Sequence, residues 1–293
     1  MEFKNITFKD LDTLKKYLNK SNSYSYCNTP TTFYMWQKLM EYKIYESANK
    51  DYLIIMFLNN TFYIPFGNIE LGLKDLTEHC KQKSIKLKII ASEGERMTRC
   101  LKFFKQQNIY LKIGEVPEEF EYIYNTLDLI ELKGKKYHSK RNHITNFIKT
   151  YNFTFEILNE KNQQEFLNLS EQWCKEKNSN DHTVEIEQDA IKMLINKKNE
   201  LGIFGGAIRV NGKLAAFSLA SEINEETADI HVEKALKDFP NAYTVINNCF
   251  AKEVLSKYKY INREDDMGLE GLRKAKLSYH PCKILKKYLL EEN

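Results

Sequence analysis

The segment from Asn262 to Lys276 concentrates side chains that could do chemistry. A strand-like apolar run ends at Asn262, and acids, glycines and bases follow in turn: Glu264, Asp265 and Asp266, then Gly268 and Gly271, then Arg273, Lys274 and Lys276. Glycines let the backbone approach a ligand closely, and lysine or arginine binds anions. We therefore expect Asp265 and Asp266 to hold a nucleophile or an amine and the three bases to hold a phosphate. The alternative is a tight surface turn with an ion-pair cluster.

A second group of polar side chains lies on a predicted strand at residues 228–233. A period of two places Asp229, His231 and Glu233 on one face and three apolar residues on the other. If this strand borders a cleft, burial could bring the pKa of an imidazole or a carboxylate toward neutrality. His231, Glu233, Asp265 and Asp266 are thus the candidates for a catalytic base, and the choice among them stays open. The alternative is a strand with a solvated polar face.

Six lysine and arginine residues and no acid occur between Glu131 and Glu156, and five of the six lie on a predicted helix from Gly134 to Tyr151. The net charge of +4 is too small for a whole surface that binds nucleic acid, so any polyanion site must be local. This basic helix suits the phosphates of a tRNA acceptor arm, a lipid headgroup or a nucleotide carrier, although a solvated helix face is the alternative. The predicted substrate- and phosphate-binding residues are Lys136, Lys140, Arg141, Tyr243, Asn247, Arg263, Arg273, Lys274, Lys276 and Tyr279.

Other patterns bear on cofactors and on the compartment. No glycine occurs between Gly212 and Gly268, so the glycine-rich loop that cradles the pyrophosphate of coenzyme A is missing, which disfavours acyl-CoA as the donor. The six cysteines are scattered without a C-x-x-C pair, which predicts reduced thiols and no metal site. The longest apolar run, Leu53 to Leu58, is too short to span a bilayer. We expect a cytoplasmic protein without a transmembrane segment, compatible with peripheral membrane contact.

The order of the predicted elements indicates an α/β (α+β) protein. Helix, three-strand meander, helix and strand occur twice, and Asn211-Gly212 has the signature of a type I′ hairpin turn in the second half. This is the order of a GNAT-type (acyl-CoA N-acyltransferase-like) domain. The sequence therefore predicts two tandem GNAT-like domains, residues 1–125 and 126–293, each a mixed, mostly antiparallel sheet flanked by helices, with the active cleft in the second.

Four stretches carry a resemblance to a known family: Lys133–His143, His231–Lys234, Asn241–Tyr243 and Asn262–Pro281. With these, the chain resembles a bacterial family similar to the C-terminal catalytic domain of lysyl-phosphatidylglycerol synthases. The resemblance implies a tandem GNAT-like fold, shared with Fem-type aminoacyltransferases, in which an aminoacyl-tRNA donates an amino acid to a lipid, a cell-wall component or a small amine or hydroxyl acceptor. Our leading hypothesis is an acyl- or aminoacyl-transferase without a metal or redox cofactor. The competing hypothesis is a non-catalytic GNAT-like module that senses an anionic metabolite.

Overall fold

The chain folds into two compact units, each built on one sheet. The structure is a computed structural model that describes residues 1–18, 23–177 and 182–292. The first unit comprises residues 1–121, 265–270 and 284–293, and the second comprises residues 122–264 and 271–283. Each unit is therefore assembled from segments far apart in the sequence.

In the described part of the first unit, eight strands form one sheet in the order β1-β2-β3-β4-β6-β15-β7, with β5 paired to β3. All pairs are antiparallel except the pair β4 and β6. Its elements are β1 (Lys4–Asn5), η1 (Phe8–Asp10), α1 (Leu11–Leu18), η2 (Tyr26–Asn28), α2 (Pro30–Met35), α3 (Gln37–Met40), β2 (Lys43–Glu46), β3 (Tyr52–Phe57), η3 (Leu58–Asn60), β4 (Thr61–Tyr63), β5 (Phe66–Gly67), α4 (Ile69–Lys83), β6 (Lys88–Ser92), α5 (Glu95–Gln106), β7 (Leu111–Glu115), η4 (Pro117–Glu119) and β15 (Lys287–Glu292).

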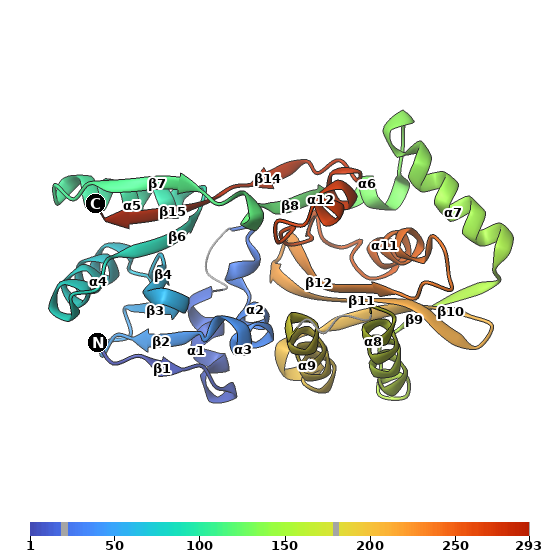
Figure 1. Cartoon of the computed structure of the whole chain (residues 1–293), viewed down its shortest axis with the longest axis horizontal. Helices are drawn as coiled ribbons and strands as arrows, with labels where there is room; N and C mark the ends of the chain where they lie inside the picture. The colour runs from blue at the N-terminus through green and yellow to red at the C-terminus, as the bar shows by residue number, and fades with distance from the viewer. Residues whose placement is uncertain (19–22, 178–181, 293) are drawn as a thin grey trace. The chain divides into compact units, whose positions relative to one another are not determined.

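The last strand of the chain lies in this first sheet. β15 pairs antiparallel with both β6 and β7, and its Leu290 is fully buried in the core that α4 and α5 also line (Figure 1). The fold of the first unit thus depends on the C-terminal residues.

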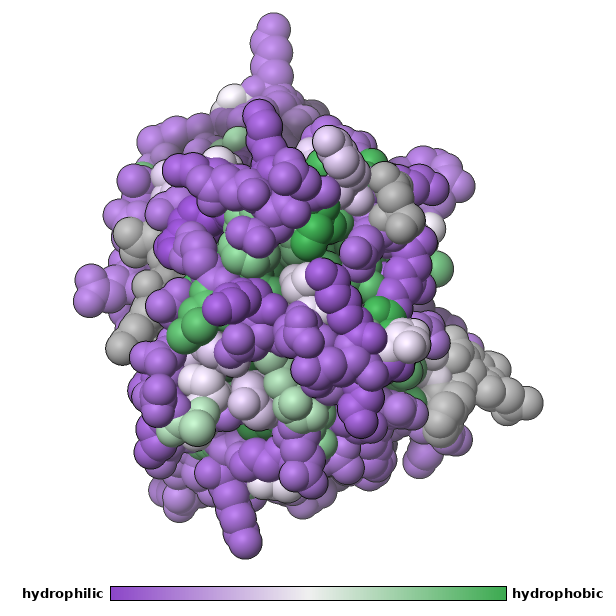
Figure 2. Space-filling view, turned by 90° about the vertical axis from the view of Figure 1, so that its left-hand side faces the viewer, coloured by the Kyte–Doolittle hydropathy of each residue, from purple (hydrophilic) through white to green (hydrophobic). Residues whose placement is uncertain are grey.

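The face of the molecule drawn in Figure 2 is mainly hydrophilic, and its hydrophobic areas are small and separate.

The second sheet has the order β14-β8-β13-β12-β11-β10-β9 in the part of the chain that the structure describes. The ladders β9–β10, β10–β11, β11–β12 and β8–β13 are antiparallel, and the ladder between β12 and β13 is parallel. The elements are β8 (Glu121–Asn125), α6 (Thr126–Glu131), η5 (Lys135–Tyr137), α7 (His138–Thr150), β9 (Phe153–Ile157), α8 (Gln163–Lys177), α9 (His182–Asn196), α10 (Lys198–Leu201), β10 (Phe204–Val210), β11 (Lys213–Asn224), β12 (Thr227–Ala235), α11 (Ala242–Glu253), β13 (Tyr260–Asn262), α12 (Glu270–Leu277) and β14 (Lys283–Leu285). Mixed, mostly antiparallel sheets flanked by helices confirm the predicted fold class.

Helices cover both faces of the second sheet. α11 packs on β10, β11 and β12, and α6 and α7 pack against α11, whereas α8 contacts β11 and β12 from the opposite face and α9 packs on α8 (Figure 1). Asn211 and Gly212 both have positive φ angles, 49° and 83°, as the predicted type I′ turn between β10 and β11 requires. Among the described residues, no helix is long and apolar enough to cross a membrane.

Candidate functional site

The predicted site residues lie on or just after two neighbouring strands, β12 and β13. These strands pair along only part of their length. β13 pairs with β12 only through Thr227–Asp229, which lie opposite Tyr260–Asn262, although β12 runs on to Ala235. Beyond Asn262 the chain stays with β8 instead, because Arg263 N–H donates to the Tyr122 carbonyl and Tyr122 N–H donates to the Glu264 carbonyl. Beyond Asp229, therefore, the side chains of β12 lie beside a loop.

A β-bulge at His231 changes which side chains share a face. Leu219 lies opposite Val232 while Ala220 lies opposite Ile230, so His231 is the extra residue of β12. The alternation shifts at that point. Asp229 and His231 lie together on one face, whereas Glu233 contacts Asn247 of α11 on the other. The prediction that all three share one face is wrong, because a period of two fails across a bulge.

On the α11 face, five residues form what we call the arginine cluster: Lys140, Glu233, Asn247, Arg263 and Tyr279. Arg263 Nη2 lies 2.9 Å from Glu233 Oε1, and Asn247 Nδ2 donates to Glu233 Oε2 at 3.1 Å. The ion pair is largely desolvated, since the side chains of Arg263 and Glu233 are 13% and 11% exposed. The Tyr279 ring contacts two cations, with its centroid 3.8 Å from Lys140 Nζ and 4.8 Å from Arg263 Cζ. All five residues come from the second unit.

The electrostatics of the arginine cluster favour a bound anion. Arg263 Nη1 is buried and has no hydrogen-bond partner among the residues that the structure describes. Burial, and then the positive charge of Arg263, lower the pKa of Lys140 to about 8, although Glu233 acts in the opposite direction. Burial raises the pKa of Tyr279, so its phenol stays protonated. The cluster thus offers an unused guanidinium N–H and an amine that exchanges a proton near neutral pH.

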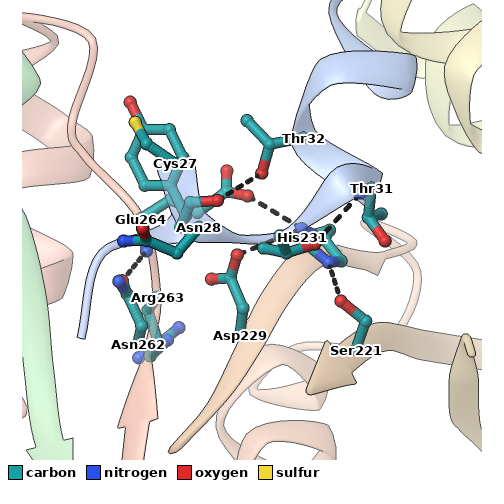
Figure 3. Close-up of polar contacts among 12 residues, drawn as sticks. Cys27, Asn28, Thr31, Thr32, Ser221, Asp229, His231, Asn262, Arg263 and Glu264 are labelled. Carbon is teal, nitrogen blue, oxygen red and sulfur yellow. Dashed lines mark hydrogen bonds and ion pairs between the residues drawn. The ribbon is translucent and has the colours of Figure 1, made fainter. Parts of the chain in front are cut away.

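On the opposite face, four residues form what we call the histidine cluster: Ser221, Asp229, His231 and Glu264 (Figure 3). His231 Nε2 lies 2.7 Å from Ser221 Oγ, and His231 Nδ1 lies 3.0 Å from Glu264 Oε1 and 3.3 Å from Asp229 Oδ2. Asn262 Oδ1 accepts a hydrogen bond from Glu264 N–H at 2.7 Å and so fixes the start of the loop that carries Glu264. Consecutive residues, Arg263 and Glu264, therefore serve opposite faces of the sheet.

Comparison with known proteins assigns the chain to a family. The family model described as phosphatidylglycerol lysyltransferase, C-terminal, matches residues 19–291. The chain belongs to this lysyltransferase C-terminal family. No curated protein matches it.

Solved structures agree with the family assignment. A conserved protein of unknown function from Bacteroides thetaiotaomicron VPI-5482 is 32% identical, with 100% of each chain covered and a TM-score of 0.90. L-PGS from Bacillus licheniformis is 15% identical with a TM-score of 0.66, and 99% of this chain and 93% of that chain are covered. A tandem GNAT protein from the clavulanic acid biosynthesis pathway is 9% identical with a TM-score of 0.50, covering 99% and 98%. The predicted resemblance and the tandem GNAT-like fold are confirmed.

In this member of the lysyltransferase C-terminal family, two side chains that were predicted to bind phosphate donate hydrogen bonds to backbone carbonyl oxygens of the chain instead. Lys276 is buried, and its ammonium group donates to the Arg263 carbonyl, which holds the backbone of the arginine cluster in place. Arg141 donates to the carbonyl oxygens of Leu132 and Gly134 and so ties α7 to the loop before it. In the structure, Lys276 therefore holds the backbone at Arg263, and Arg141 holds the loop before α7.

The remaining predicted residues lie elsewhere in the second unit or in the first unit. Tyr243 accepts a hydrogen bond from Trp173 Nε1 at 2.9 Å. Lys136 is exposed in η5, just before α7. Arg273 and Lys274 lie on α12, where Lys274 is exposed. Asp265, which accepts from Tyr26 Oη at 2.8 Å, and Asp266, which accepts from Gly268 N–H, belong to the first unit. Their role as catalytic residues stays a prediction.

Sequence reasoning missed two features of the site. Ser221 faces His231 from β11 because it pairs with Asp229 across the sheet, a register that no local pattern specifies. Lys234, next to Glu233, pairs with Glu187 of α9 and lies 3.6 Å from the centroid of the Trp173 ring. It therefore anchors α8 and α9 to the end of β12.

Proposed function

We propose that the chain is an acyl- or aminoacyl-transferase whose reaction takes place at the arginine cluster of the second unit. The observation that carries the proposal is the buried Arg263 Nη1, which has no partner in the described ranges, beside Lys140. A guanidinium N–H held in place by the Glu233 ion pair can stabilise a phosphate or the oxyanion that develops during acyl transfer. Glu233, one of four residues that the sequence offered as a catalytic base, then serves to position Arg263 instead.

The transfer needs alignment and the movement of one proton. The amine or hydroxyl of the acceptor attacks the donor's ester carbonyl, a bond forms to the carbonyl carbon, and the ester C–O bond breaks. The attacking group loses a proton, and the leaving hydroxyl gains one. With a pKa of about 8, Lys140 is partly neutral at pH 7 to 8, so it can accept the first proton and return the second.

An aminoacyl-tRNA is the donor that we propose. Two observations support this donor. The family is named after a phosphatidylglycerol lysyltransferase. The helix α7, which carries Lys140, lies in a segment that contains lysine and arginine but no acidic residue. Lysines of that segment, such as Lys136 and Lys149, would contact tRNA phosphates, and Lys140 would reach the acyl group. The acceptor would be a lipid, a cell-wall component or a small amine or hydroxyl compound.

Transfer from charged tRNA tests the proposal. Purified protein is incubated with tRNA that carries radiolabelled amino acids and with vesicles containing phosphatidylglycerol or with a panel of small amines, and labelled product is measured. We expect transfer by the wild-type protein and at least a 100-fold loss in Arg263→Gln. Arg209→Gln is the matched control, because Arg209 pairs with Glu156 and Glu165 at the sheet edge and should leave transfer unchanged. Anion binding that needs Arg263, without transfer from any charged tRNA, would instead support the sensing module.

A further inference from the structure

We propose that Asp229, His231 and Glu264 bind a divalent transition metal of the zinc class. One ligand atom from each residue lies within 4.8 Å of the other two, and these atoms are two carboxylate oxygens and an imidazole nitrogen. The three residues all belong to the second unit, and Asp229 and His231 are buried. Nitrogen and oxygen donors of these kinds bind Zn²⁺ at about 2.0 to 2.2 Å.

The distances at His231 fit adjacent positions in a coordination shell. Ligands about 2.1 Å from a metal are about 3.0 Å apart in an octahedral shell and about 3.4 Å apart in a tetrahedral one. His231 Nδ1 lies 3.0 Å from Glu264 Oε1 and 3.3 Å from Asp229 Oδ2. A cation could therefore sit between the three atoms after only small side-chain rotations.

Ser221 supplies the outer contact that such a histidine needs. Metal-binding histidines usually donate the N–H of their other ring nitrogen to a neighbouring acceptor, which fixes the tautomer. Here Ser221 Oγ lies 2.7 Å from His231 Nε2. When Nε2–H donates to Ser221, the lone pair of Nδ1 points toward the two carboxylates (Figure 3). The histidine cluster is then arranged as a metal site with its orienting group in place.

The fold explains why residues distant in sequence supply the ligands. The alternation of β12 places His231 on the face of Asp229, the bulge turns only the later Glu233 away, and Glu264 follows β13 where that strand separates from β12. A metal would cross-link the two strands at this point, and a three-ligand site leaves room for water or a substrate oxygen. The inference does not rest on the proposed function, because the arginine cluster lies on the other face of the sheet.

Zinc titration of the whole chain tests the inference. Wild type, Asp229→Asn, Glu264→Gln and the control Glu187→Gln are stripped of metal and titrated with Zn²⁺ by calorimetry, with thermal unfolding measured in parallel. Glu187 is a suitable control because it is a carboxylate of the same unit that pairs with Lys234 instead. Circular dichroism checks that each variant is folded, and diffraction at the zinc absorption edge locates the ion.

We expect one zinc per chain with a micromolar or tighter dissociation constant and a melting temperature that rises with zinc concentration. Affinity should fall at least tenfold in Asp229→Asn and Glu264→Gln and stay unchanged in Glu187→Gln. If folded Asp229→Asn and Glu264→Gln bind zinc as the wild type does, or if the wild type binds none, the inference is overturned. The histidine cluster would then be a hydrogen-bonded ion cluster.

Discussion

The Arg263–Glu233 ion pair allows the most quantitative test of the arginine cluster. Removing one partner of a buried ion pair leaves an uncompensated charge, which costs about 3 to 5 kcal/mol. Both side chains keep about a tenth of their surface exposed, and Asn247 still donates to Glu233 when Arg263 is gone. We therefore expect about 3 kcal/mol of destabilisation in Glu233→Gln and about 2 kcal/mol in Arg263→Met.

The double variant distinguishes an ion pair from two independent side chains. Arg263→Met combined with Glu233→Gln buries no charge at either position, so it should be at least 2 kcal/mol more stable than the sum of the single effects predicts. Free energies of unfolding come from urea titrations of the four proteins at pH 7, with equal m-values as the check on two-state behaviour. Effects that add to within about 0.5 kcal/mol would refute the proposed coupling.

Three further predictions follow from single groups. The pKa of Lys140 is about 8 in the folded state against about 10.4 in the unfolded chain, so between these pH values the unfolded chain binds more protons and stability should rise with pH from 8 to 10. Lys140→Met should abolish that rise and should add about 1 kcal/mol of stability at pH 7, after allowance for solvent screening. Urea unfolding measured at several pH values checks both effects. Acetyl-CoA at millimolar concentration should stabilise the chain by less than about 1 kcal/mol in thermal unfolding, and a micromolar dissociation constant would contradict this. In Gly206→Ala the new Cβ would lie 2.3 Å from Phe155 Cζ, so urea unfolding should show a loss of about 1 to 3 kcal/mol. In Gly271→Ala the new Cβ would meet no atom within 4 Å apart from its chain neighbours and its own helix backbone, so stability should not fall.

Local sequence patterns predicted the helices, strands and turns better than they predicted which strands pair with one another. Asn211-Gly212 predicts its hairpin because the positive φ angles depend on those two residues alone. The strand carrying His231 and the strand ending at Asn262 form a parallel ladder, although they lie about 30 residues apart in the sequence. The return of β15 to the first sheet depends on its pairing with β6 and β7, which lie far away in the sequence, so local patterns do not predict it.

The same limit explains the site. Lys140, Asn247, Arg263 and Tyr279 could each be named from the sequence. Their convergence depends on the packing of α7 against α11 and of α11 against β12, which the sequence does not specify. Glu233 was assigned to the wrong face because a single bulged residue shifts the alternation without a distinctive sequence pattern.

A crystal structure with a stable donor analogue tests the central claim most directly. The analogue is a 3′-aminoacylamino-adenosine phosphate, in which an amide replaces the reactive ester of the donor. We predict that its carbonyl or phosphate oxygen lies within hydrogen-bonding distance of Arg263 Nη1, with Lys140 Nζ beside the carbonyl carbon. An analogue bound by wild type and by Arg263→Gln with equal affinity, and located away from both residues, would contradict the account.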